Sequence, residues 1–427
     1  MRRLLVAAVA VAVFWAAPNA FAGTWCGSGE TGNDRPDAVT GPQIHAIYVV
    51  PADGADTFAA GADELAADIS SITTWWAGQD PTRIPRFDNA VFPAGTCTDI
   101  SFVRIAQPGS AFSGSAVTAF TLLETELATI GYDDPYKKYL VYYGGPPPED
   151  DVCGTGAGDF ADGPSFAVVW LGGCPEAPDD AVAAHELLHA LGALPAGAPN
   201  ACTAADDPFG VDDPGHPCDS PLDVLYPASS GQPLQSLYLD YNHDDYYAHS
   251  GGWLDIQDSL WMHLLGVTQV PLALTIDGAG GVFSDLPGVI CVTSCTTQWD
   301  PGSKVQLTAV PATGQRFIGW SGTCAGPGTC ALSLTGAAAV TAHFGPSRVP
   351  FHLAIAGRGT VACTPKCRST AAAGRPLLLR AKPAAGWAFL RWTGACKGTS
   401  PTCRPSTESA VSVRATFTKK PKAKKQR

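Results

Sequence analysis

Three residues near the middle of the chain have the types and the spacing needed to hold and use a metal ion: His185, Glu186 and His189. On a helix, side chains four residues apart lie on the same face, about 6 Å from one another. The two imidazoles can therefore reach one metal ion, with the Glu186 carboxylate beside it. This arrangement is the H-E-x-x-H zinc pattern, in which the glutamate acts as general base.

The surrounding sequence favours a helix, with a proline and two acids in the first turn, an apolar stripe and a glycine at the end. These residues are Pro178, Asp179, Asp180, Val182, Leu188, Leu191 and Gly192. A structural zinc site is closed by four Cys or His ligands, whereas a catalytic site keeps a water in the fourth position. No CxxC pair stands near the helix, so we expect a catalytic site that hydrolyses peptide bonds, with Glu186 taking the proton from a zinc-activated water. The alternative is a buried helix whose two histidines only make hydrogen bonds.

Through Gly192, the motif resembles that of the metzincin metalloproteases, which continues as H-E-x-x-H-x-x-G-x-x-H. Pro195 stands where that motif has its third histidine or, in some members, an aspartate. Residues 220–227 resemble the metzincin turn beneath the zinc, with Leu225 at the methionine position, followed by Tyr226. The resemblance spans residues 44–266 in general plan. It implies a metzincin-like catalytic domain with an apolar floor at Leu225.

The third zinc ligand is expected between the helix and this turn. His216 is the only histidine there, and we predict it as the ligand. An aspartate of the same loop, His243 and His249 are the alternatives, and His216 could instead be an exposed loop residue without a metal role. A disulfide between Cys202 and Cys218, which flank the loop, would hold His216 near the helix.

Strand and helix patterns alternate before the motif. Strands are expected at 44–50, 100–105, 139–143 and 166–171, and helices at 58–77 and 116–130. The alternation indicates an α/β or α+β fold with a mixed, mostly parallel sheet. His45, alone on the first strand, is interpreted as structural. Residues 254–266 have helical spacing, which predicts a closing helix that contains Met262.

The region between Gly192 and Trp253 is rich in proline, glycine and aspartate and shows little periodicity. Loops this long are often functional or bound to ions. Two aspartate pairs in it are candidate ligands for a structural Ca²⁺, which prefers oxygen donors. Solvated surface carboxylates are the alternative explanation. The four residues are Asp206, Asp207, Asp212 and Asp213.

The first 22 residues have the features of a secretory signal peptide: two arginines, an apolar run and a small-residue site at Ala20-Phe21-Ala22. No second long apolar run follows, so we expect an exported protein without a membrane span. Export to an oxidising compartment suits the 14 cysteines, which we expect to form disulfides. The predicted pairs are Cys26–Cys97, Cys153–Cys174, Cys202–Cys218, Cys291–Cys295, Cys324–Cys330, Cys363–Cys367 and Cys396–Cys403.

The remainder of the chain is a tandem duplication. Its first four cysteines, from Cys291 to Cys330, recur from Cys363 to Cys403, and the segment 317–324 recurs at 389–396. Short alternating stretches broken by Gly and Pro predict two small all-β modules that need disulfide staples. They resemble bacterial cell-surface repeats related to the internalin B-type repeats, which implies spacer or adhesion modules. Trp320 and Trp392 are expected in their cores, with sugar stacking as the alternative.

Charge is divided unequally along the chain. Residues 23–270 hold 6 Lys/Arg against 35 Asp/Glu, whereas residues 347–427 hold 17 against one. The acidic part should draw basic or neutral peptides more readily than acidic ones. The basic end, with a disordered tail at 419–427, is expected to contact an anionic cell-envelope polymer, unless the tail only aids solubility. No nucleotide-binding signature is present, and no nucleic acid partner is expected.

These observations predict a secreted or cell-surface zinc metalloendopeptidase with Zn²⁺ held by His185, His189 and His216. The alternative is a cell-surface binding or adhesion protein with an inactive protease-like domain, which Pro195 and Leu225 favour. The expected divisions are a signal peptide at 1–22, a metalloprotease-like domain at 23–270, β modules at 271–346 and 347–418, and a basic tail at 419–427.

Overall fold

The structure is a computed structural model that describes residues 25–156, 163–194, 197–228 and 231–421. The predicted signal peptide, Pro195 and the last six residues of the basic tail lie outside the described residues. The chain divides into two compact units, residues 1–267 and 268–427. Among the described helices, none is both long enough and apolar enough to cross a membrane.

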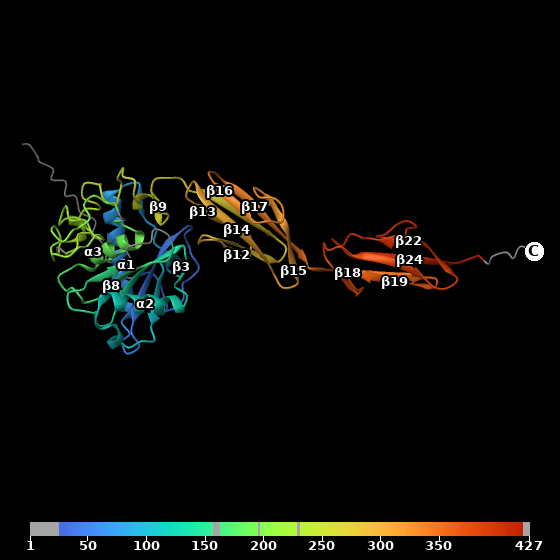
Figure 1. The fold of residues 1–427 in the computed structure, drawn as a ribbon, viewed down its shortest axis with the longest axis horizontal. Coiled ribbons are helices and arrows are strands. Elements are labelled where there is room, and N and C mark those ends of the chain that lie inside the picture. Colours follow the sequence, from blue (N-terminus) through green and yellow to red (C-terminus); the bar gives the residue numbers. More distant parts are fainter. Residues whose placement is uncertain (1–24, 157–162, 195–196, 229–230, 422–427) are drawn as a thin grey trace, which may run out of the picture. The chain divides into compact units, whose positions relative to one another are not determined.

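The first unit, coloured from blue to yellow in Figure 1, is built on a five-stranded sheet. Its strand order is β5-β1-β6-β8-β7. Strands β5, β1, β6 and β8 run parallel, and β7 pairs antiparallel with β8 at the edge. The bounds are β1 (Gln43–Val50), β5 (Ile100–Arg104), β6 (Lys137–Tyr143), β7 (Gly154–Gly156) and β8 (Phe166–Trp170). The sheet is therefore mixed and mostly parallel, as predicted.

Three helices cover the two faces of this sheet: α1 (Phe58–Gln79), α2 (Ala116–Thr129) and α3 (Asp179–Leu191). One side of β1, including Ile44 and Tyr48, packs in the same buried cluster as α1 and α3. The other side, including Ile47 and Val49, packs with α2. Because both faces of the parallel strands are covered, their sequence is mostly apolar and does not alternate between apolar and polar residues.

Helix α3 forms where the sequence predicts it. Pro178 is its N-cap residue, and Asp179 and Asp180 make the first turn acidic, which suits the positive end of the helix dipole. Gly192 ends the helix in a left-handed conformation with φ of 91°, which a glycine adopts without steric cost. The helix therefore presents His185 and His189 from a firmly bounded segment.

The predicted helix at 254–266 is wrong. Residues Ile256–Asp258 form a single 3₁₀ turn, η3, and Met262–Leu264 form strand β9, which pairs with β2 (Arg83–Pro85). The Asp255 carboxylate accepts a hydrogen bond from the backbone amide of Gln257, and such local side-chain bonds favour turns over helices. Pairing with β2 then satisfies backbone groups that a longer helix would have satisfied internally.

Smaller elements complete the first unit. Strands β3 (Asn89–Phe92) and β4 (Gly95–Thr98) form a hairpin, and η1 (Gly109–Phe112) and η2 (Leu234–Ser236) are 3₁₀ turns. His45 is fully buried, with Nδ1 2.9 Å from an Asp88 oxygen and Nε2 3.0 Å from the Ser101 hydroxyl. These contacts support its interpretation as a structural residue.

Buried carboxylates organise the long segment after α3, which has few regular elements. Asp240 accepts hydrogen bonds from the backbone amides of Tyr246 and Tyr247. Asp223 accepts from the amide of Leu225 and from the Tyr246 hydroxyl, and burial raises the pKa of Asp223 to about 7. Aspartates that were only loop signals in the sequence thus fix the path of the chain.

The second unit contains two β modules, each with two sheets around one buried cluster. Module 1 consists of β10 (Val270–Asp277), β11 (Gly280–Ser284), β12 (Ile290–Cys291), β13 (Cys295–Trp299), β14 (Ser303–Pro311), β15 (Gln315–Gly322), β16 (Cys330–Leu334) and β17 (Ala338–Pro346). Module 2 consists of β18 (Arg348–Ala356), β19 (Gly359–Thr364), β20 (Thr370–Ala372), β21 (Leu378–Pro383), β22 (Trp387–Gly394), β23 (Thr402–Cys403) and β24 (Val411–Lys419).

The duplicated tryptophans have the same role in both modules. Trp320 and Trp392 are 5% and 2% exposed, and their indole nitrogens donate to the carbonyls of Gly328 and Ser400. Both are core residues, as expected. The seven predicted disulfides are all present, and no cysteine is free.

Candidate metal centre

Three imidazoles meet above α3. The Nε2 atoms of His185 and His189, one helical turn apart, lie 3.2 Å from each other. The Nε2 atom of His216 lies 3.1 Å from each of them. The structure therefore places the predicted third ligand with the helical pair, across 27 residues of sequence from His189.

This triangle has the dimensions of a zinc site. Zinc binds histidine nitrogens at about 2.0–2.1 Å, so two ligands at the tetrahedral angle have nitrogens about 3.3 Å apart. Burial, with the neighbouring imidazoles next in importance, lowers the pKa of His185 to about 3 and that of His189 well below its usual range. The two rings are therefore neutral, which is the protonation state that binds a metal.

Polar groups behind the ligands fix the orientation of two rings. Nδ1 of His185 lies 2.9 Å from the carbonyl oxygen of Val224. Because a carbonyl can only accept, Nδ1 carries the proton and Nε2 keeps its lone pair for a metal. Nδ1 of His216 lies 2.9 Å from a carboxylate oxygen of Asp213, and this contact with His216 lowers the pKa of Asp213.

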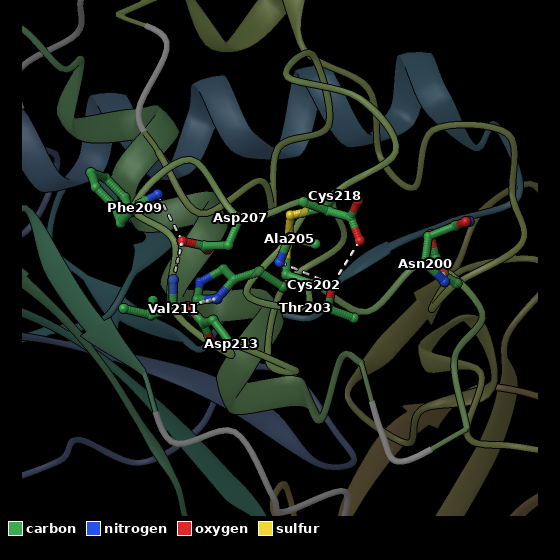
Figure 2. The surroundings of a disulfide bond; sticks show 12 residues. Asn200, Cys202, Thr203, Ala205, Asp207, Phe209, Val211, Asp213 and Cys218 are labelled. Atoms are coloured by element: carbon green, nitrogen blue, oxygen red, sulfur yellow. Dashed lines mark hydrogen bonds and ion pairs between the residues drawn. A yellow bond between two sulfur atoms is a disulfide. The ribbon is translucent and has the colours of Figure 1, made fainter.

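The Cys202–Cys218 disulfide closes the loop that carries His216. Next to it, the amide of Cys202 donates to the His216 carbonyl, and that of Cys218 donates to the Asn200 carbonyl. Figure 2 shows Asp207 beside the disulfide, where it accepts from the amides of Phe209 and Val211. The bridge and this turn together hold His216 over α3.

Glu186 is buried beside the histidines. It is 6% exposed, and burial raises its pKa to about 8. Strand β7 passes so close that a Cβ atom at Gly154 would lie 2.4 Å from Oε1 of Glu186, and one at Gly156 would lie 2.6 Å from Cβ of His189. The backbone therefore requires glycine at position 156, where a Cβ would also lie 2.7 Å from the Glu186 carbonyl oxygen, whereas a side chain at position 154 would displace the Glu186 carboxylate. Glycine at alternate strand positions was a signal of close approach that the sequence interpretation did not use.

A cavity of about 620 Å³ opens onto the site, and His185, Glu186 and His216 line it. Three further carboxylates lie in its wall, those of Asp151, Glu176 and Asp223, and no Lys or Arg is among the lining residues. Tyr226 also lines the cavity. Leu225 is fully buried in the cluster that contains α1 and α3, and the Val224 carbonyl before it contacts His185.

The other ligand candidates lie elsewhere. The ring of His249 stacks on Trp253 with centroids 4.7 Å apart, and His243 lies in a turn with φ of 55°. Asp213 supports His216 instead of joining the triangle. In the described part of the chain, no three of the four candidate calcium ligands, Asp206, Asp207, Asp212 and Asp213, converge, and the calcium site remains a prediction.

Comparison with known proteins identifies the second unit. Residues 287–348 and 352–421 match the sequence model of the family described as "Divergent InlB B-repeat domain". The predicted resemblance of the two modules is thereby confirmed, and cell-surface-type repeats with many disulfides indicate an extracellular protein. The match does not include the first unit, so its resemblance to the metzincins stays a prediction.

Two further comparisons add little. No curated protein matches the chain. Among solved structures, the major pilin protein (T-13) from Streptococcus pyogenes serotype GAS131465 is similar over 36% of this chain and 98% of the pilin chain, at 8% sequence identity and a TM-score of 0.16. That score is too low to support an argument about the fold.

Proposed function

We propose that the first unit is a zinc-dependent peptidase, carried outside the cell with its two β modules. The observation that supports this proposal is the convergence of three Nε2 atoms, each 3.1–3.2 Å from the others, beside a buried glutamate. Three protein ligands leave one position for water, which is the pattern of catalytic zinc sites.

The residues present fit this metal, with His185, His189 and His216 as its ligands. When bound, zinc polarises a carbonyl and makes its water acidic enough to react at neutral pH. Glu186 would act as the general base, holding the proton of the attacking water and passing it to the leaving amine. Glu186 lines the cavity beside His185 and His216, where its carboxylate can reach a water and the substrate.

Strand β7 offers a place for an extended substrate. Among the described strands, it is the last in the sheet order and pairs only with β8. An extended peptide can add to such an edge through backbone hydrogen bonds. The absence of side chains at Gly154 and Gly156 brings β7 within contact distance of Glu186, so a peptide on this edge would pass the catalytic groups.

Cavity charge favours basic or neutral side chains in the substrate. Asp151 and Glu176 stand in the wall, and the lining has no cation to balance them. The first unit as a whole carries 35 acidic residues against 6 basic ones in residues 23–270. At low salt, attraction should raise the rate for basic peptides, and the effect should fall as salt screens it.

Metal content and peptide hydrolysis, measured on the same preparations, test the proposal. The native protein should contain about one zinc per chain, and His216→Ala should lose both zinc and activity. His243→Ala removes a histidine of the same loop region outside the triangle and should keep both. Glu186→Gln should keep zinc but lose hydrolysis. A folded native protein that binds no zinc, or an active Glu186→Gln variant, would contradict the proposal.

A further inference from the structure

Module 2 has a hollow of about 250 Å³ whose charged lining residues are all basic. It lies between the start of β18, the Cys367 region and the turn before β21. The four cations at its rim are Arg348, Lys366, Arg368 and Arg375. No aspartate or glutamate lines it, so the hollow presents four positive charges to the solvent.

These charges are not neutralised within the described part of the chain. Arg348 donates to the hydroxyl and carbonyl oxygens of Thr370, which leaves its charge uncompensated. No ion pair joins any of the four cations to a described carboxylate. The one acid of residues 347–427, Glu408, pairs with Arg316 instead. All four side chains remain exposed and available to an anion.

The duplication supplies an internal comparison. Cys295 corresponds to Cys367 by sequence. The strand pairing agrees with this correspondence. Val270 of β10 pairs with Trp299 in module 1, and Val349 of β18 pairs with Ala371 in module 2. At the four positions of the cations, module 1 has only neutral polar residues. The corresponding pairs are Gln269 and Arg348, Ser294 and Lys366, Thr296 and Arg368, and Ser303 and Arg375.

The same comparison explains the hollow itself. Trp299 is 1% exposed and fills the core of module 1, whereas Ala371 stands at the corresponding position of module 2. Replacing an indole by a methyl group leaves space that the surrounding strands do not fill. Two changes on one frame, a smaller core residue and four cations, thus occur together in module 2.

We propose that this hollow binds the anionic groups of a cell-envelope polysaccharide. The planar guanidinium groups of three arginines suit the paired oxygens of phosphate or carboxylate. The small volume fits one charged unit of a polymer, and the extracellular setting indicated by the disulfides and repeats favours a glycan over a nucleic acid. This binding is independent of the proposed peptidase activity, because it uses neither the first unit nor a peptide.

Binding of the full-length protein to immobilised polymers tests the proposal. The probes are a phosphate-bearing mannan, the carboxylate-bearing polygalacturonate, neutral dextran and duplex DNA. We expect binding to one or both anionic glycans, weakened by salt, and none to dextran. Binding to the mannan alone, to polygalacturonate alone or to both supports the proposal and identifies the recognised group. Failure to bind either glycan, or tighter binding of DNA, would overturn it.

A charge-matched pair of variants tests the position of the site. The double variant Arg368→Thr and Arg375→Ser installs the residues of module 1 and should weaken binding about tenfold, as the loss of two exposed ion pairs. The control, Arg391→Gln and Arg414→Gln, removes the same charge from exposed strand positions outside the hollow and should have a much smaller effect. Equal weakening by the two double variants would show that binding depends only on total positive charge, and it would refute a binding site at the hollow.

A third variant distinguishes the contribution of the hollow's space to binding from that of its charges. Ala371→Trp installs the indole that module 1 carries, fills the space and keeps all four cations. If the thermal transition shows that this variant is folded, its binding should fall as far as that of Arg368→Thr with Arg375→Ser. Undiminished binding by the folded variant would exclude the hollow as the site. If the variant does not fold, the charge-matched pair decides the question.

Discussion

In the first unit, three disulfides accompany two buried clusters, one on each face of the sheet. Each module, in contrast, has a single cluster and two disulfides. The bridges of the modules span 4 to 7 residues, and those of the first unit span 16 to 71. Small domains cannot bury enough apolar surface to be stable alone, so bridges supplement the core there.

The difference suggests that disulfides have one role in the modules and another in the first unit. In the modules, short bridges fix strand ends next to a thin core. In the first unit, the core can support the fold, and the bridge from Cys202 to Cys218 holds a functional loop in place. Three of the following predictions test that division, and a fourth tests a buried charge of the first unit. They begin with the largest expected effect.

Removing the longest bridge should have the largest effect on stability. The chain-entropy relation gives about 4 kcal/mol for a loop of the size closed by Cys26 and Cys97. The variant Cys26→Ser with Cys97→Ser should lower the free energy of unfolding of the first unit by that amount, as measured by calorimetry. Zinc content should not change, because the bridge contributes nothing to the histidine triangle. Loss of zinc from the folded variant would contradict the division of roles.

Removing the Cys202–Cys218 bridge should lower stability by about 3 kcal/mol on the same relation. It should also weaken zinc binding by roughly 10- to 100-fold, the usual range when the supports of a metal ligand are lost. Competition with a zinc chelator measures this affinity. An affinity equal to that of the native protein would show that the loop holds His216 without the bridge.

A bridge of module 1 should contribute less in absolute terms. The loop between Cys324 and Cys330 is short, and the same relation gives about 2 kcal/mol. Cys324→Ser with Cys330→Ser should lower the unfolding transition of the second unit and leave that of the first unit unchanged. A shift in both transitions would show that the two units do not unfold independently.

The smallest effect should come from one buried charge of the first unit. Asp68 accepts a hydrogen bond from the Tyr142 hydroxyl, and burial, together with nearby acids, raises its pKa to about 7. Because the folded state holds this proton more tightly than the unfolded chain, the stabilisation is complete below about pH 4 and is lost as the pH rises to about 7. Asp68→Asn should therefore raise the melting temperature of the unit at pH 8 and change it little at pH 4. Equal melting-temperature shifts at both values would contradict this origin.

Much of this architecture could be predicted from the sequence. The alternation of apolar segments predicted the mostly parallel sheet and two of its helices, and the motif segment with its end signals predicted the third. Close cysteine spacing favoured the four bridges of the modules, whereas the three bridges of the first unit were predicted without such an argument. The failure at 254–266 has a local cause. Helical spacing of apolar residues was present there, but the Asp255 side chain stabilises a turn and β2 offers a pairing partner, and neither contact is visible in periodicity.

By itself, the sequence determined the pair formed by His185 and His189, because one helical turn fixes their separation whatever the rest of the chain does. The sequence also showed the tandem duplication, and the difference in charge between the acidic residues 23–270 and the basic residues 347–427. Only the tertiary structure decided that His216 joins the pair, that the Val224 carbonyl orients His185, and that Ala371 leaves a hollow among cations. These features depend on contacts between residues far apart in the chain, and their geometry is set by packing across the whole unit, which no local spacing records.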